Sequence, residues 1–340
     1  MQAGSNEGTR QINTLETDNC GRLVGVKQSS YTVGHRFFFD CQVHTDASDG
    51  QRSPAQLARE VYERNLTVVV TDHFTLDGAT SAMGELDHLK ATMGNGEAAK
   101  IIPGVEFSVK PEKSLYPRMR NMHVLGLGVD AHSKSLNRWV RRQRHRRRTC
   151  LEHAHSVRER MEGEKIRFNA DFEKRLMIYG NVYKAIAKSI RSDENIKPIW
   201  RHLGVKVNIK RSRHMPKKTR QRLLEKQIID SLTRVYGDPF VKRPSIYEAV
   251  EVINRAKGLA SVAHLLASNP RLKHASTSRL GRFLGELRDF GFSGVESYHP
   301  AHDVVCADKL ANVSREQELY VFAGSDAHEL SDEIAYFIKE

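Results

Sequence analysis

Histidine and carboxylate residues recur in this sequence next to short apolar runs. They occur in the segments Asp40-Cys41-Gln42-Val43-His44, Ser48-Asp49-Gly50, Thr71-Asp72-His73, Gly104-Val105-Glu106, His123, Ala263-His264 and Gly324-Ser325-Asp326-Ala327-His328. Imidazole and carboxylate ligands together suit zinc, manganese or iron, and a carboxylate can bridge two ions. Paired ions of this kind serve in-line displacement at phosphorus. We therefore interpret these residues as a metal-dependent catalytic site.

The apolar runs that position these residues have the length and composition of β-strands. We predict strands at residues 37–43, 67–71, 100–102, 122–127, 259–263, 294–297 and 319–323. Helical spacing is found at residues 54–64, with Ser53 as N-cap and Pro54 in the first turn, and at 246–257 and 278–290. Strands that alternate with helices predict a parallel sheet, either open or closed into a barrel. Catalytic groups gather at the carboxyl ends of such strands, so we expect the histidines and carboxylates to converge.

Three regions of different character are predicted along the chain. Residues 1–34 lack a sustained period and are interpreted as a loose leader with a short strand near 22–26. Residues 35–132 and 240–340 carry the strand pattern of the barrel. Residues 133–239 interrupt it with long charged helical patterns, which indicate a basic helical insertion.

Composition narrows the class of protein and of partner. The 340 residues contain no apolar run near the ~20 residues that cross a bilayer. The N-terminus has no apolar segment typical of a secretory signal, so we expect a cytoplasmic protein without a membrane partner. The four cysteines form no C-x-x-C pair, which disfavours a disulfide framework or a cysteine zinc site. The net charge of +13 favours a polyanionic partner such as a nucleotide or nucleic acid over a merely solvated basic surface.

The ordered motifs resemble the polymerase-and-histidinol-phosphatase (PHP) superfamily of phosphoesterases. The resemblance runs from about Phe37 to His328 and includes Thr-Asp-His-x-Thr-Leu-Asp-Gly, Ile-Pro-Gly-Val-Glu, Gly-Val-Glu-x-Tyr-His-Pro-x-His and Gly-Ser-Asp-x-His. The sequence is most similar to the branch of 3′,5′-nucleotide bisphosphate phosphatases and 5′–3′ exoribonucleases. That resemblance implies a distorted (β/α)7 barrel with a helical insertion.

The resemblance also implies two or three divalent ions, manganese first, with zinc or iron as alternatives. The first ion would be held by Gln42, His44, Glu106 and Asp326. The second would be held by Glu106, His123 and His264, and the third by Asp49, His73 and His328. Glu106 would bridge, and Glu106, His264 and Asp326 would be the catalytic residues. Water activated by the ions would attack the phosphorus.

Three positions depart from the family pattern. Gln42 stands where the family has the first histidine of His-x-His, and an amide oxygen is a weaker ligand than imidazole. The family's Arg-Pro-His in the inserted region corresponds to Gly180-Asn181-Val182-Tyr183-Lys184, and its Ala-His-Pro corresponds to Ala263-His264-Leu265.

Substrate contacts are predicted outside the ligand set, at Lys184, His299, His302, Arg144 and Arg148. The two arginines belong to the densest cationic run, residues 138–148, and a second basic stretch covers 206–222. Arginine-rich helices bind phosphate, and the alternative for each run is a solvated helix face. No protein partner is deduced.

Three functions remain open. The first is a phosphoesterase, either a phosphatase or an exonuclease, acting on nucleotides or on 5′ ends of RNA or DNA. The second is a barrel with impaired or lost hydrolysis that serves as a basic nucleic-acid-binding module, which Gln42 and the missing Arg-Pro-His favour. The third is an amidohydrolase acting on C–N bonds, for which we find no metal-bridging lysine at a strand end. The ligand set favours the phosphoesterase, because a binding module has no need of it.

Overall fold

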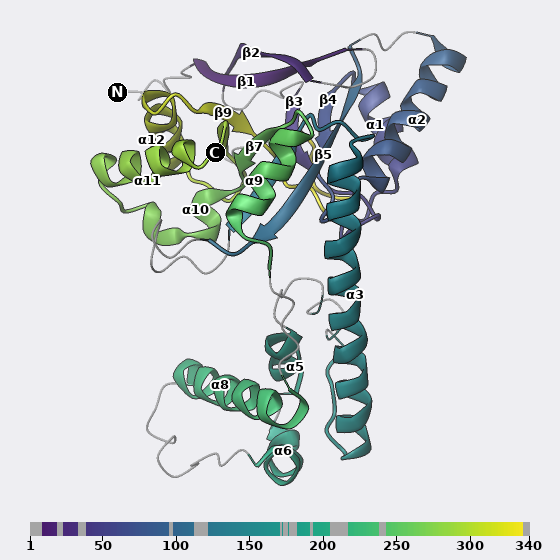
Figure 1. Ribbon diagram of the computed structural model, residues 1–340, viewed down its shortest axis with the longest axis vertical. Coiled ribbons are helices and arrows are strands. Elements are labelled where there is room, and N and C mark those ends of the chain that lie inside the picture. The colour runs from purple at the N-terminus through teal and green to yellow at the C-terminus, as the bar shows by residue number, and fades with distance from the viewer. Residues whose placement is uncertain are drawn as a thin grey trace, which may run out of the picture. The chain divides into compact units, whose positions relative to one another are not determined.

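Seven strands form one sheet that nearly closes into a barrel. The computed structural model describes residues 9–18, 23–32, 39–94, 98–111, 122–170, 172, 176, 182–190, 193–204, 217–237 and 243–335. By its internal contacts the chain divides into two units, Met1–Gln143 with Arg243–Glu340, and Arg144–Lys242. The seven-stranded sheet belongs to the first unit (Figure 1).

The strands of the barrel follow one another around the sheet in chain order. They are β3 Phe39–Val43, β4 Thr67–Val70, β5 Lys100–Val109, β6 Met122–Leu127, β7 Leu259–Val262, β8 Gly294–Tyr298 and β9 Tyr320–Ala323. Most of their residues are buried, as expected of apolar runs covered on both faces. The first and last strands meet through a bridge between Val43 and Ala327, with the N–H of His44 donating to the Ala327 carbonyl at 3.1 Å. This contact brings the two ends of the sheet together.

The prediction of an all-parallel sheet is wrong for one strand. β6 runs antiparallel to both β5 and β7, whereas the other neighbouring pairs are parallel. Antiparallel neighbours need no crossover helix, and the sequence has no helical pattern between residues 110 and 121. Because β6 is reversed, its beginning lies at the end of the barrel where the other strands finish.

Helices that follow the strands bury one apolar face each. They are α1 Pro54–Glu63, α2 Asp77–Met93, α9 Ile246–Arg255, α10 Leu265–Ser268, α11 Thr277–Asp289 and α12 Val304–Glu316. The predicted start of α1 is confirmed, because Ser53 forms a capping box with Gln56 and Pro54 begins the helix. Leu57, Ala58 and Val61 of α1 are buried. In Figure 1 helices α1 and α2 lie beside each other, next to strands β4 and β5.

The segment predicted as a loose leader contains an antiparallel hairpin in its described residues, and the short strand predicted near residues 22–26 falls in the second strand of this hairpin. The strands are β1 Thr9–Thr17 and β2 Leu23–Thr32. Ile12 and Leu15 are buried, and Asn13 accepts a hydrogen bond from the Val321 N–H at 2.8 Å. The buried residues of β1 do not alternate with exposed ones, so the sequence shows no strand pattern there. The hairpin is stabilised by its contacts with β9.

Every element that the structure describes between residues 144 and 242 is helical. Helix α3, Lys134–Gly163, begins in the first unit, and α5 Val182–Ile190, α6 Ile196–Leu203 and α8 Lys217–Tyr236 follow, with the short η1 Asp193–Asn195. This unit has its own apolar core, which includes Ile186, Leu203 and Ile228. It also carries the whole positive excess, because Asp and Glu slightly outnumber Lys and Arg in the rest of the chain. The predicted boundaries at residues 132 and 239 stay predictions.

None of the described helices combines the length and the apolar character that crossing a membrane requires.

Candidate metal centre

The structure brings together every residue that the sequence assigned to the metal site. Three groups of side chains have ligand atoms close enough to hold an ion: His44, Asp49, His73 and His328; Glu106, His123 and His264; and His44, Glu106 and Asp326. His44 and Glu106 each belong to two groups, so the three groups form one continuous cluster. The convergence follows from the placement of these residues at one end of the barrel strands.

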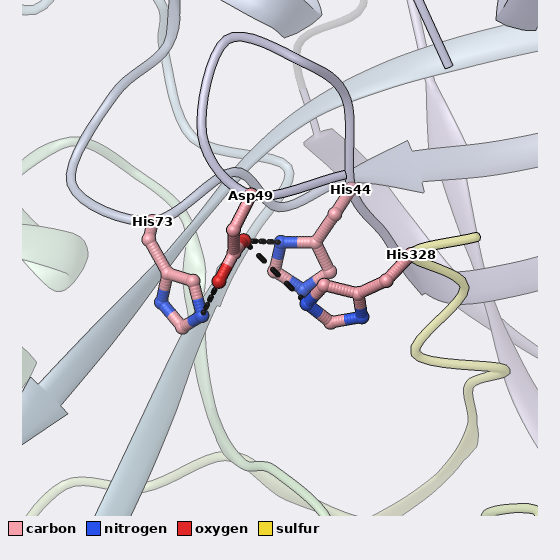
Figure 2. A group of neighbouring side chains, drawn as sticks. All are labelled: His44, Asp49, His73 and His328. Carbon is pink, nitrogen blue, oxygen red and sulfur yellow. Dashed lines mark ion pairs between the residues drawn. The ribbon is translucent and has the colours of Figure 1, made fainter. Parts of the chain in front are cut away.

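Asp49 lies at the centre of the first group, which is drawn in Figure 2. One carboxylate oxygen, Oδ2, is 3.5 Å from His73 Nε2. The other, Oδ1, is 3.5 Å from His328 Nε2 and 3.6 Å from His44 Nδ1. Figure 2 shows the three imidazoles facing this single carboxylate from three separate segments of the chain.

Glu106 joins the remaining groups through its two carboxylate oxygens. Oε1 is 2.5 Å from His123 Nδ1 and 3.4 Å from His264 Nε2. Oε2 is 3.1 Å from His44 Nε2 and 3.6 Å from His73 Nε2. Glu106 is only 1% exposed, so this carboxylate is surrounded by four imidazoles away from water. Such a group is placed to bridge two ions.

The reversed strand β6 accounts for His123. This residue lies at the beginning of its strand, opposite Ser108 of β5. Had β6 been parallel, the start of the strand would have lain at the far end of the barrel from the other ligands.

Backbone geometry at two ligands is unusual for residues other than glycine. His264 and Asp326 have φ values of 27° and 53°. Such conformations persist where the surroundings over-determine them, and they cluster at functional sites. The N–H of His264 donates to the Glu296 carboxyl group, and the N–H of Asp326 donates to the Gln42 carbonyl at 2.9 Å. These bonds hold both side chains toward the cluster.

Three buried acidic residues that the sequence analysis did not single out support the ligands. Asp72 accepts hydrogen bonds from the Thr45 N–H at 2.7 Å, the Thr45 hydroxyl and the Ser48 hydroxyl, both at 2.6 Å, and so fixes the loop between His44 and Asp49. Asp40 accepts from the N–H groups of Gln42 and Ser325, both at 3.0 Å. Glu296, which accepts from the His264 N–H, is the third of these residues. All three lie inside the sequence motifs quoted above, and that position was the signal by which the sequence could have indicated them.

The carboxylates and histidines shift one another's ionisation. Burial alone would raise the pKa of Glu106, but the charges of His73 and His123 hold that pKa well below its ordinary value. Burial opposes protonation of His264, yet its hydrogen bond with Glu106 raises the pKa of this histidine to about 9. For His73 burial dominates and lowers the pKa to about 4. The cluster therefore has ionised carboxylates at neutral pH.

Several polar atoms of the cluster are suited to cation binding. His44 Nδ1, His73 Nδ1 and Asp49 Oδ1 are buried, and none of them has a hydrogen-bond partner within the described residues. Unsatisfied buried polar atoms are costly, roughly 1–3 kcal/mol each. A divalent ion would satisfy nitrogen and carboxylate oxygen atoms of this kind, so the His and Asp/Glu groups fit the ions that the sequence predicted.

The predicted substrate residues are divided between the two units. His299 lies in the barrel unit with its Nε2 3.6 Å from Asp326 Oδ2. Its Nδ1 accepts from the Ala301 N–H at 3.0 Å, so the neutral ring carries its hydrogen on Nε2. Nε2 has no hydrogen-bond partner among the described residues, which leaves a donor directed at the metal cluster.

For three further residues, contact with substrate stays a prediction. Lys184 on α5 is exposed, as are Arg144 and Arg148 on α3, and all three belong to the second unit. Arg148 pairs with Glu152 of the same helix at 2.9 Å. Residues 180 and 181, and most of the stretch 206–222, lie outside the described residues.

His302 is held by backbone groups on both sides of its ring. Nδ1 is 2.8 Å from the Ser297 carbonyl, and Nε2 accepts from the Ala267 N–H at 3.3 Å. Both ring nitrogens are therefore used within the fold, which argues against the predicted direct contact with substrate. His302 instead connects strand β8 with helix α10.

His302 should make the stability of the fold depend on pH. Burial lowers its pKa to about 4 from an ordinary value of 6.5. The unfolded chain thus binds a proton between pH 6.5 and 4 that the folded chain does not, so this contribution to stability is complete above pH 6.5 and is lost as the pH falls. Between pH 7.5 and 5 we expect a loss of about 2 kcal/mol from this residue. The free energy of unfolding, measured with urea at both pH values, gives this loss. The loss should be smaller in His302→Gln than in the wild type. An equal loss in the two proteins would contradict the assignment of this pH dependence to His302.

Two solved structures share this fold. An amidohydrolase from Chromobacterium violaceum, with bound sulfate and no metal, aligns at a TM-score of 0.52 and 20% identity over 88% of this chain and 90% of its own. A protein from Bifidobacterium adolescentis, provisionally assigned as a metal-dependent phosphoesterase, aligns at 0.52 and 19% identity over 89% and 92%. No protein-family model and no curated protein sequence matches the chain. The likeness confirms the distorted α/β barrel and is consistent with the PHP-type fold that the motifs resemble.

Proposed function

We propose that this chain is a metal-dependent phosphoesterase that hydrolyses phosphate esters of nucleotides or of nucleic-acid 5′ ends. The observation that carries the proposal is the shared carboxylate of Glu106, which contacts ligands of all three groups. A carboxylate in this position can hold neighbouring cations at the separation used for displacement at phosphorus.

The residues of the site have distinct tasks in this proposal. Divalent ions held by side chains of this cluster would supply Lewis-acid stabilisation of charge on the phosphoryl oxygens. Asp49 and Glu106 orient the imidazoles that surround them. His299 directs its Nε2–H toward the cluster, 3.6 Å from Asp326 Oδ2, where it would donate to a phosphoryl oxygen of the substrate. Asp72 holds the loop that carries Asp49.

The charge of the second unit supports a polyanionic substrate or partner. It holds the entire positive excess of the chain, with exposed cations on helices α3, α5, α6 and α8. Cation-rich surfaces attract nucleic acid through its phosphates without reading sequence. Nucleic-acid binding without hydrolysis is therefore the second candidate function, and the ligand groups of the barrel favour hydrolysis over it.

An amidohydrolase activity is the third candidate. The Chromobacterium structure is described as an amidohydrolase, and the ligand types are shared between the two chemistries. In this chain Glu106 belongs to two of the ligand groups, and we find no lysine at a strand end that could bridge ions as expected for C–N hydrolysis. This favours the phosphoester reaction.

The test is phosphate release by the full chain, purified without chelator and supplied with Mn²⁺. The substrates are a 3′,5′-bisphosphonucleotide and a 5′-phosphorylated RNA, with an N-acyl amino acid as the probe for amide hydrolysis. We expect metal-dependent phosphate release, reduced roughly 100-fold in Asp49→Asn because three imidazoles lose their shared carboxylate. Asp46→Asn is the matched control, because Asp46 is an exposed residue of the same loop.

Each result separates the candidates. Phosphate release that survives in Asp49→Asn would place the activity elsewhere or in a contaminant. Amide hydrolysis without phosphate release would favour the third function. RNA binding with neither reaction, at full metal content, would favour the binding module.

A further inference from the structure

The amide group of Gln42 lies among the ligand atoms of one metal group. Its side chain is buried, and Nε2 is 2.8 Å from Asp326 Oδ1, 3.0 Å from Glu106 Oε2 and 3.5 Å from His44 Nε2. These are the residues of the group His44, Glu106 and Asp326. Within it, His44 Nε2 is 3.1 Å from the same Glu106 oxygen and 3.2 Å from the same Asp326 oxygen. The amide nitrogen thus contacts all three atoms that an ion at this position would need.

An amide nitrogen and a metal ion exclude each other at such a position. The NH₂ group has two hydrogens to donate and no acceptor capacity, so it cannot be a ligand. It can, however, direct one hydrogen at each of two carboxylates, and hydrogen bonds to ionised acceptors are among the stronger ones. The two carboxylates, Glu106 and Asp326, are therefore satisfied without a cation between them.

The alternative orientation of the amide is disfavoured without an ion. Rotating it by half a turn would place Oε1 against the same two carboxylate oxygens, where acceptors face acceptors. Oε1 now has no hydrogen-bond partner within the described residues, so the amide is held from its nitrogen side. The contacts with Glu106 and Asp326 determine its orientation.

We propose that the Gln42 amide takes the place of a divalent ion at the position of His44, Glu106 and Asp326, so that the loaded protein holds two ions. The other two groups keep their ligands, because Glu106 still directs Oε1 at His123 and His264, and Asp49 still faces His73 and His328. This inference rests on the proposed function only in taking those two groups as ion sites. A histidine at position 42 would remove the donor and add a ligand.

The test counts ions in the full chain. Wild type, Gln42→His and Gln42→Glu are saturated with Mn²⁺, freed of unbound ion by gel filtration, and measured by elemental analysis against protein concentration. Gln227→His, an exposed glutamine on α8, controls for an added imidazole. We expect two ions in the wild type and in Gln227→His, and one more in Gln42→His or Gln42→Glu. Gln42→Glu keeps the test open if the histidine variant does not fold, because glutamate is close to glutamine in size and cannot donate when ionised.

Three ions in the wild type, or the same count in wild type and in both Gln42 variants, would overturn the inference and leave the phosphoesterase proposal standing. No ions in any of the proteins would overturn both.

Discussion

Replacing Glu106 by glutamine is expected to abolish phosphate release while the barrel stays folded. The carboxylate contacts His123 and His264 through one oxygen and His44 and His73 through the other, so its charge serves more than one ion position. An amide at this position keeps the size of the side chain but cannot hold two cations. We expect a loss on the order of 1000-fold or more in kcat, together with a lower content of bound Mn²⁺.

Glu296→Gln is the matched control for this variant. Both glutamates are buried in the barrel near His264, but burial raises the pKa of Glu296 well above its ordinary value, whereas the pKa of Glu106 is lowered. Glutamine at position 106 therefore removes a carboxylate whose ionised form the surrounding histidines stabilise, whereas at position 296 it replaces a carboxyl group whose ionised form burial disfavours. A much smaller loss is expected at 296. Near-normal turnover in Glu106→Gln, with circular dichroism showing a folded protein, would mean that Glu106 is not the bridge.

Removing four arginines from α3 is expected to weaken RNA binding on the order of 100-fold at physiological salt. The variant replaces exposed residues by glutamine, which keeps a high helix propensity: Arg141, Arg142, Arg144 and Arg148. A single strand reaches enough cations to release several counterions, whereas a mononucleotide does not. The slope of log affinity against log salt should become shallower by about 0.7 for each phosphate that the variant no longer neutralises.

The control removes the same number of charges from exposed positions of the barrel unit outside α3: Arg59, Arg255, Arg271 and Arg282. Fluorescence anisotropy of labelled RNA gives the affinity, and quenching of tryptophan emission gives a second signal. The chain has two tryptophans, of which Trp139 is 7% and Trp200 of α6 54% exposed. Equal weakening by both sets of substitutions would indicate nonspecific charge attraction, and equal losses for RNA and mononucleotide would place the arginines at the catalytic phosphate.

The barrel and the ligand set could be predicted from the amino-acid sequence, because both depend on residue patterns within short segments. A strand end followed by His44, His73 or His264 is visible in a few residues, and recurrence of that pattern requires the ligands to converge. The capped start of α1 at Ser53 is equally local. Predictions of this kind need no knowledge of what lies across the sheet.

Features that depend on partners far away in sequence became visible only in the folded chain. The direction of β6 is set by its pairing with β5 and β7, and the hairpin of β1 and β2 is stabilised by β9. The sequence reveals that Gln42 stands where a histidine was expected, but not what its amide contacts. That its nitrogen faces Glu106 and Asp326 follows only from the closure of the barrel, which brings β3 against the turn after β9. A hydrogen bond between residues far apart in the sequence leaves no periodic signal, because each partner alone is compatible with many environments.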